Sequence, residues 1–220
     1  MKCKIIAVVL ILAMTVLLCG CEFSVPFLSK PEDAVNEFMT QDSLMEVLSR
    51  FDDISSEDVD DIATAFWVDV LTSPSVKSLL LDNVRCISYN ITNTTINGNK
   101  ATVTVLITHY DMSPVIDIAF EIFFNKVMDL DASGVEVPED EDELMDLLMP
   151  LISQSIKEAV AKTKPSETYT KVRFDCEKNS SGTWELREIP DDFIDKVLLM
   201  NFEYAIEDCL NNLYSYEHRG

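Results

Sequence analysis

Basic residues, glycine, histidine and cysteine are all scarce in this sequence, and each shortage excludes a class of protein. The 220 residues include 17 lysines and arginines against 39 acids, a formal net charge of −22. A surface of that charge repels nucleic-acid phosphates and anionic lipid headgroups, which argues against a nucleic-acid-binding protein. With only 5 glycines and 47% apolar residues, the chain has instead the composition of a globular domain with one core.

Histidine and cysteine are too few and too scattered for zinc binding or a full disulfide framework. The two histidines are His109 and His218, and no cysteine spacing matches a zinc site. Beyond the N-terminal Cys21, three thiols remain at positions 86, 176 and 209, an odd number. A disulfide between Cys176 and Cys209 and two buried free thiols are both compatible with the pattern. No phosphate-binding loop, pair of glycosidase carboxylates or nucleophile elbow is evident.

The first twenty residues have the layout of an export signal. Two lysines in Met1–Lys4 precede the uncharged stretch Ile5–Leu18. Fourteen residues are too few for a good spanning helix, because a bilayer core of about 30 Å takes roughly twenty. We therefore predict a cleaved signal peptide over residues 1–20, with an ordinary secretory signal or a short uncleaved anchor as the alternatives.

A lipid-attachment motif closes this signal. Leu18-Cys19-Gly20-Cys21 resembles the bacterial lipobox, in which leucine at −3 and a small residue at −1 precede the cysteine that becomes the N-terminus. Cys19 is the rival acceptor, but it would place the bulky Leu18 at −1. We expect diacylglyceryl and amide-linked, palmitate-type chains on Cys21, because a single acyl chain gives only marginal membrane binding.

Cleavage would leave a short tether and a strongly acidic mature chain. Removal of Lys2 and Lys4 leaves 15 basic and 39 acidic residues, a formal charge of −24. Residues 21–30 form the predicted lipidated tether, whose nine residues after Cys21 span on the order of 30 Å when extended. The protein would then lie on the extracytoplasmic face of the cell membrane.

The rest of the chain is predicted to form one α+β domain over residues 31–213, followed by a flexible tail at 214–220. Its N-terminal helices are expected at Pro31–Phe38, at 43–51 and at about 55–72, after which a short turn leads to Leu81. Two further helices are expected between the strands, at about 114–130 and 139–162, the second kinked at Pro150. A C-terminal helix from Pro190 completes the prediction.

Two antiparallel β-hairpins are predicted from period-two alternation, forming a curved sheet with the helical pair inserted between them. The first starts near Val84 and turns at Asn97-Gly98, a pair that suits tight hairpins. Its alternation places Cys86 on the wet face of the strand. The second hairpin runs from Thr168 to Leu186 around a turn at 179–182, with Cys176 on the dry face.

These elements resemble a known family. The lipobox, the helix opening Pro31-x-x-Ala34-Val35-x-x-Phe38 and the strand Gly182-Thr183-Trp184-Glu185-Leu186 are similar to an NTF2-like (cystatin-like) lipoprotein of Gram-positive bacteria. The resemblance implies a sheet curved round helices into a cone, in proteins that range from isomerases and dehydratases to binding or scaffolding modules. It therefore does not fix a function.

Two candidate sites follow from individual residues. A pocket enzyme of the isomerase or dehydratase kind would use His109 at the inward end of its strand, with Tyr89, Asp111 and Trp184 as pocket candidates. The alternative is that His109 is a hydrogen-bonded histidine where a strand runs into a helix, and that Tyr89 and Trp184 belong to the core.

The second candidate is a weak calcium site. Asp129, Asp131, Ser133 and Asp140 have the spacing of EF-hand ligands, with Gly134 at the sharp turn. The alternative is a helix C-terminus followed by the acidic first turn of the next helix. No other cofactor is expected.

The favoured hypothesis is a membrane-anchored binding or scaffolding lipoprotein without catalytic machinery. Its partner would be an unknown protein, a wall component or a small apolar ligand, and not nucleic acid. The alternative is the NTF2-like enzyme that uses His109.

Overall fold

The computed structural model describes residues 30–49, 70–134, 138, 140–206 and 208, which gather into two compact units. We call the first the sheet unit, because it holds the strands, and the second the helical unit. Each unit is discontinuous in sequence, so the chain passes between them repeatedly, and the predicted single domain stays a prediction. Of the described residues, the sheet unit comprises 30–49, 80–110 and 167–200, and the helical unit 70–79, 111–134, 138, 140–166, 201–206 and 208.

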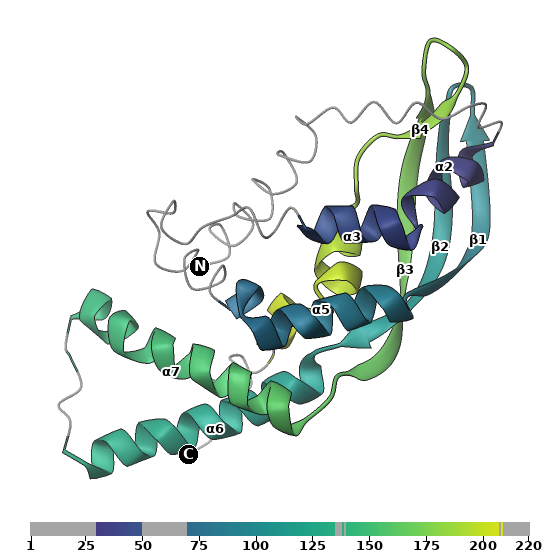
Figure 1. The fold of residues 1–220 in the computed structure, drawn as a ribbon. Helices are drawn as coiled ribbons and strands as arrows, with labels where there is room; N and C mark the ends of the chain where they lie inside the picture. The colour runs from purple at the N-terminus through teal and green to yellow at the C-terminus, as the bar shows by residue number, and fades with distance from the viewer. Residues whose placement is uncertain (1–29, 50–69, 135–137, 139, 207, 209–220) are drawn as a thin grey trace, which may run out of the picture. The chain divides into compact units, whose positions relative to one another are not determined.

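A curved, four-stranded antiparallel sheet forms the sheet unit (Figure 1). Its strand order is the sequence order, so the two hairpins lie side by side with β2 next to β3. This confirms the α+β class and both predicted hairpins. The strands are β1 (Ser88–Asn97), β2 (Lys100–Asp111), β3 (Ser166–Lys178) and β4 (Trp184–Leu186).

Both hairpin turns depend on glycine. Asn97 pairs with Lys100, so the first turn is Gly98-Asn99, one residue later than predicted, and Gly98 has a φ of +65°. A positive φ at the first central residue alone is typical of a type II′ turn. In the second turn, Gly182 has a φ of +82°, and the Asn179 side chain accepts hydrogen bonds from the backbone N–H groups of Ser181 and Thr183.

One face of β2 and β3 is fully buried. Val103, Val105 and Ile107 on β2 and Val172 and Phe174 on β3 have no exposed surface. The residues between them on β3 are exposed, as the predicted alternation requires. We call the buried face the inner face and the opposite one the outer face.

A β-bulge in β1 was not predicted. Ile91 pairs with Val105 and Asn93 with Thr104, so Thr92 has no partner in the register. Its hydroxyl instead donates to the Thr104 carbonyl at 3.2 Å. Because a bulge adds one residue to its strand, it returns Thr94 to the inner face, opposite Val103.

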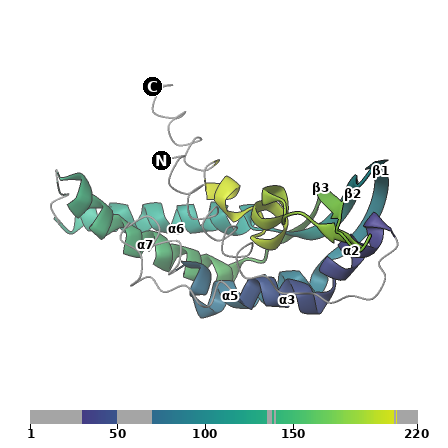
Figure 2. The ribbon, with the colours of Figure 1, turned by 90° about the horizontal axis from the view of Figure 1, so that it is seen from above.

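Helices α2 (Pro31–Phe38) and α3 (Gln41–Ser49) lie on one side of the strands (Figure 2) and confirm the first two predicted helices. The ring of Phe38 at the end of α2 lies 5.7 Å from Phe174 of β3 and 5.2 Å from Phe193. Phe193 and Phe174 are themselves 5.7 Å apart, which closes an aromatic cluster on the inner face.

The segment from Pro74 to Cys86 is a helix, α5, which corrects two predictions. A turn was expected up to Leu81, and a strand was expected from Val84. Pro74 instead begins the helix, because the first position of a helix needs no N–H donor. Cys86 is exposed, as predicted, but at the end of α5 and not on a strand face.

The buried amide of Asn83 on α5 ties three segments of the sheet unit together. Its side-chain nitrogen donates to the Val197 carbonyl at 2.8 Å, and its oxygen accepts from the Tyr110 N–H at 2.8 Å. Val197 belongs to η3 (Phe193–Leu198), a π-helical segment, and Tyr110 to β2. Since Asn83 has no exposed surface, no water replaces these bonds.

The helical unit contains the predicted helical pair, α6 (Ser113–Ala132) and α7 (Glu141–Lys162). The two helices pack along each other and are joined by an ion pair of 2.7 Å between Lys126 and Glu158. Pro150 lies inside α7, which continues through it. No helix in the described part of the chain is long and apolar enough to cross a membrane.

The predicted C-terminal helix is broken into two pieces, and the third predicted helix cannot be compared. After η3 the chain turns through Met200 and Asn201, which have φ values of +56° and +61°, and residues 202–206 are helical again. Residues in the left-handed conformation end a regular helix, so the prediction of a single helix from Pro190 was wrong. Most of the helix predicted at 55–72, and the tail 214–220, lie outside the described residues.

We predict that Asn83→Ala lowers the free energy of unfolding by about 3 kcal/mol, because two buried backbone groups each lose a partner at a cost of about 1–3 kcal/mol. Urea unfolding followed by circular dichroism measures it. The matched control is the neighbouring Asp82→Ala, which removes only a surface ion pair with Arg85 and should cost less than about 1 kcal/mol. Equal effects of the two substitutions would contradict the role given to Asn83.

Candidate functional site

His109 is buried on β2 and both of its ring nitrogens have partners. Nδ1 lies 2.6 Å from the Tyr110 carbonyl oxygen and Nε2 lies 2.8 Å from the Thr170 hydroxyl on β3. A carbonyl only accepts, so Nδ1 carries a proton and donates it to this bond, while Nε2 shares a hydrogen bond with the Thr170 hydroxyl. The side chain is 2% exposed. The inward position predicted from the sequence is confirmed, and the ring joins β2 to β3 in the way a structural histidine does.

Tyr89 lies on the same face as His109, two register positions away. It pairs with Ile107 on β2, and its hydroxyl donates to the Asn36 side chain of α2 at 3.1 Å. Partial burial raises the pKa of Tyr89 above its ordinary value. The hydroxyl therefore holds α2 against β1 as a neutral group.

Trp184 is remote from His109. It pairs with Lys178, whose amine lies 5.1 Å from the centre of the indole ring. Along β3, Lys178 is eight residues from Thr170, the partner of His109, which is about 26 Å at 3.3 Å per residue. In addition, β4 and β1 are the two edges of the sheet, so Trp184 and Tyr89 lie on opposite edges. Trp184 and His109 cannot line one small pocket.

Asp111 caps a helix. One of its carboxylate oxygens accepts hydrogen bonds from the backbone N–H and the hydroxyl of Ser113, at 2.7 and 2.6 Å. Ser113 is the first residue of α6, whose initial N–H groups have no partner inside the helix. Asp111 is itself the last residue of β2, and its carboxylate stabilises the helix start.

The described residues of the predicted calcium loop lie at two helix ends, and the calcium site stays a prediction, because residues 135–137 and 139 of the loop lie outside the described residues. Asp129 and Asp131 lie in the last turn of α6, and the Ser133 hydroxyl donates back to the Leu130 carbonyl at 2.7 Å. Gly134 follows with a φ of +74°, the conformation that commonly ends helices.

Asp140 begins the next helix. Its carboxylate accepts from the Glu143 N–H at 3.2 Å, ahead of α7. Among the described residues, no group of three or more histidine, cysteine, aspartate or glutamate side chains is placed to hold a metal ion.

The helical unit encloses a small apolar cavity between α6 and α7. Its volume is about 10 Å³, and its lining is entirely apolar. A ligand pocket typically has about 300–1,000 Å³, so this cavity is a packing defect that holds no ligand. Its lining residues are Ile116, Ala119, Phe120, Phe123, Ile152, Ile156 and Ile206.

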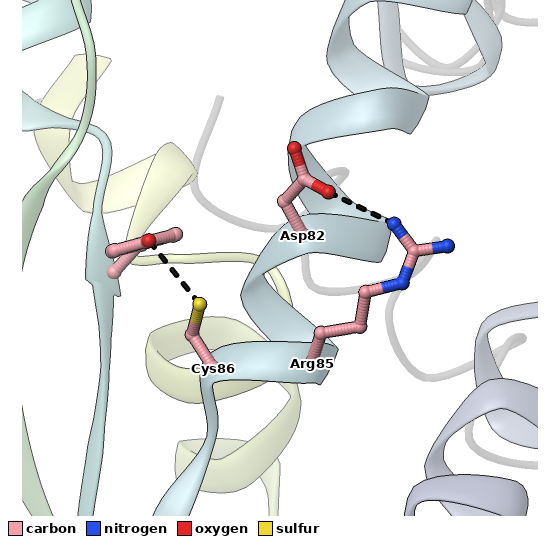
Figure 3. A network of polar contacts seen from close by, with 4 residues as sticks. Asp82, Arg85 and Cys86 are labelled. Carbon is pink, nitrogen blue, oxygen red and sulfur yellow. Dashed lines mark hydrogen bonds and ion pairs between the residues drawn. The ribbon is translucent and has the colours of Figure 1, made fainter.

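Sequence reasoning missed a polar network around Cys86. The Cys86 sulfur lies 3.2 Å from the Tyr110 hydroxyl. Figure 3 shows Cys86 beside the Asp82–Arg85 ion pair on α5. The hydrogen bond to Cys86, and then its negative charge when ionised, raise the pKa of Tyr110. No sequence pattern indicates this pair, because 24 residues separate the two side chains.

The other described cysteine is inert. Cys176 is 1% exposed and is a free thiol, as is Cys86. Burial, with smaller contributions from the negative charges of Asp175 and Glu32, raises the pKa of Cys176 to about 11. The free thiol of Cys176 agrees with the buried-thiol alternative, and Cys209 lies outside the described residues.

Comparisons with known proteins add little to these observations. No protein-family model matches the chain, and no curated protein matches it. Among solved structures, it is similar to ycdA of Bacillus subtilis, a protein inferred to be a lipoprotein, with 19% identity and a TM-score of 0.37. The match covers 85% of this chain but only 53% of that protein, so the chain spans about half of its length. At this TM-score neither fold nor function follows from the likeness, and the NTF2-like resemblance stays a prediction.

We predict that the two described thiols differ strongly in reactivity. In a chain of residues 21–220 that carries Cys21→Ser and Cys209→Ser, only Cys86 and Cys176 remain. At about pH 8 a soluble disulfide reagent should modify Cys86 rapidly and leave Cys176 untouched until the protein unfolds, because only the thiolate reacts. Absorbance of the released thiol measures both phases. Cys86→Ser should abolish the fast phase, and two fast-reacting thiols in the folded protein would contradict the burial of Cys176.

Proposed function

We propose that this protein is a lipoprotein, anchored through Cys21 on the extracytoplasmic face of the cell membrane, that binds a partner through its surface and catalyses no reaction. The anchor rests on the lipobox-like Leu18-Cys19-Gly20-Cys21 after an export signal. Two or more acyl chains on one cysteine would give stable anchoring.

The tether would join the folded protein at a fixed point. Pro31, the first residue of α2, is buried, and its carbonyl accepts a weak hydrogen bond from the Cys176 thiol of β3 at 3.8 Å. Lys30 precedes it, and its N–H donates to the Asp33 carboxylate at 3.1 Å. With α2 tied to the sheet in this way, the nine tether residues would keep the sheet unit within about 30 Å of the bilayer.

One observation carries the surface-binding role, namely that the inner face is filled along β2 and β3. The Phe38–Phe174–Phe193 cluster and the fully buried valines of β2 occupy the face on which a cone-shaped enzyme would hold its substrate. The enzymatic alternative would need His109 free to exchange a proton with a ligand, and both of its nitrogens are bonded within the protein. Binding through exposed residues needs neither a hollow nor a free base.

We predict that the full-length protein, expressed in a bacterial host that processes lipoproteins, is recovered in the membrane fraction without residues 1–20. Mass spectrometry of its N-terminal peptide should show Cys21 carrying diacylglyceryl and an amide-linked acyl chain. Cys21→Ser should leave an unlipidated chain, since only the cysteine sulfur can take the thioether-linked lipid.

Cys19→Ser is the matched control, and it should be processed like the natural chain. An unmodified thiol at position 21, or a mature chain that still begins at Met1, would refute the anchor.

A further inference from the structure

The outer face of the sheet is exposed along the middle of β3. Tyr169, Lys171 and Arg173 are exposed and alternate with Thr170 and the fully buried Val172. Helices α2 and α3 pack on the other face, as Figures 1 and 2 show. Three neighbouring side chains of β3 therefore point to solvent from a rigid support.

Register with β2 adds an apolar residue to this row. The Lys178 N–H donates to the Asn99 carbonyl, and the Thr102 hydroxyl donates to the Asp175 carboxylate, which together set how β3 lies along β2. Continued along the strands, this register places Leu106, which is 37% exposed, opposite Lys171. We call Leu106, Tyr169, Lys171 and Arg173 the basic patch.

The two cations of the basic patch have no partner in the described part of the chain. No hydrogen bond or ion pair joins Lys171 or Arg173 to another residue there. Arg85, Lys126 and Arg187, in contrast, each have an acidic neighbour within 4 Å. Both charges are available to a ligand.

The acids of β3 that share this face lie at the two ends of the row. Glu167 lies at the start of the strand, beyond Tyr169. Asp175 lies two residues beyond Arg173, about 7 Å along the strand, and Glu177 lies 3.9 Å from Arg187. Charges farther away than about 8 Å are largely screened at physiological salt, so a ligand centred on Lys171 would sense the two cations more strongly than these acids.

Tyr169 supplies an exposed ring beside these cations. It is 73% exposed, the highest value among the exposed large apolar and aromatic side chains of the described chain. A tyrosine offers an apolar ring face together with a polar hydroxyl, which suits a ligand that is itself both apolar and polar. By the same register, Thr108 lies opposite Tyr169 and pairs with Ser88 on β1, so hydroxyl side chains lie next to the ring on the outer face.

We infer that the basic patch binds a polysaccharide that carries carboxylate or phosphate groups. Sugar rings have apolar faces for Tyr169 and Leu106 and hydroxyls for the polar side chains, and their acidic groups match Lys171 and Arg173. A dense polyanion such as duplex DNA, with one charge per about 1.7 Å, would be repelled by the net charge of −22, whereas a sparsely charged polymer would not. The inference rests on the proposed function, since export brings the protein to such polymers.

The test is co-sedimentation of the mature chain, made unlipidated by Cys21→Ser, with purified bacterial wall sacculi. One preparation keeps its phosphate polymers, and the other has lost them to hydrofluoric acid and retains the carboxylates of the wall. We expect saturable binding that weakens with added salt, and a loss of affinity of at least tenfold in Lys171→Glu/Arg173→Glu. Tyr169→Ala should weaken binding severalfold.

The control Lys162→Glu/Lys164→Glu makes the same change of charge on exposed residues of the helical unit and should bind like the parent. Circular dichroism melting checks that each variant is folded. Binding to both preparations identifies carboxylates as the ligand, and binding only to the untreated one identifies phosphates.

Three results overturn the inference: no sedimentation with either preparation, an equal loss in the control variant, or flotation with phosphatidylglycerol vesicles in place of wall binding. Because this assay uses unlipidated protein, it does not test the lipid anchor. The anchor is tested separately by the mass of the N-terminal peptide.

Discussion

Burial of one face of β2 and β3, and only one, is the constraint on which the sheet unit depends. Val105 and Phe174 have no exposed surface, and α2 and η3 supply the aromatic rings that cover Phe174. Since successive side chains of a strand point to opposite faces, a slip of one residue would expose this whole set. The outward position of Lys171 and Arg173 is thus fixed by the burial of Val172 and Phe174 between and beside them.

The elements that sequence predicted well are those with a strong period. The two hairpins and the pair α6 and α7 agree with the structure to within a few residues. The wrong or missed predictions concern residues that are compatible with two different local structures. Pro74 can interrupt a helix or begin one, and which it does depends on packing that the sequence does not display. The bulge at Thr92 gave no signal, because threonine and asparagine suit either face of an edge strand.

For the candidate sites too, the sequence predicted what depends on one strand and missed what depends on how strands are arranged. The inward position of His109 could be predicted because it depends only on alternation along one strand. The separation of Trp184 from His109 could not, because it depends on strand order and register. Aspartate, serine and glycine are typical both of ligand sites and of helix caps. The sequence therefore made Asp111 and Asp140 candidates for a site, whereas in the structure each carboxylate accepts a hydrogen bond at the start of a helix.

The distribution of charge restricts which partners the proposed surface would accept. A partner with dense negative charge is repelled by the net charge of −22 as it approaches, before it can reach Lys171 and Arg173. A sparsely charged partner meets little repulsion and, within the screening length of about 8 Å, interacts more strongly with those two cations than with the acids at the ends of the row. The excess of acidic residues would then select partners with a low density of negative charge, in addition to keeping the protein soluble. A neutral protein with the same two cations would lack this discrimination, because nothing would oppose the approach of a dense polyanion.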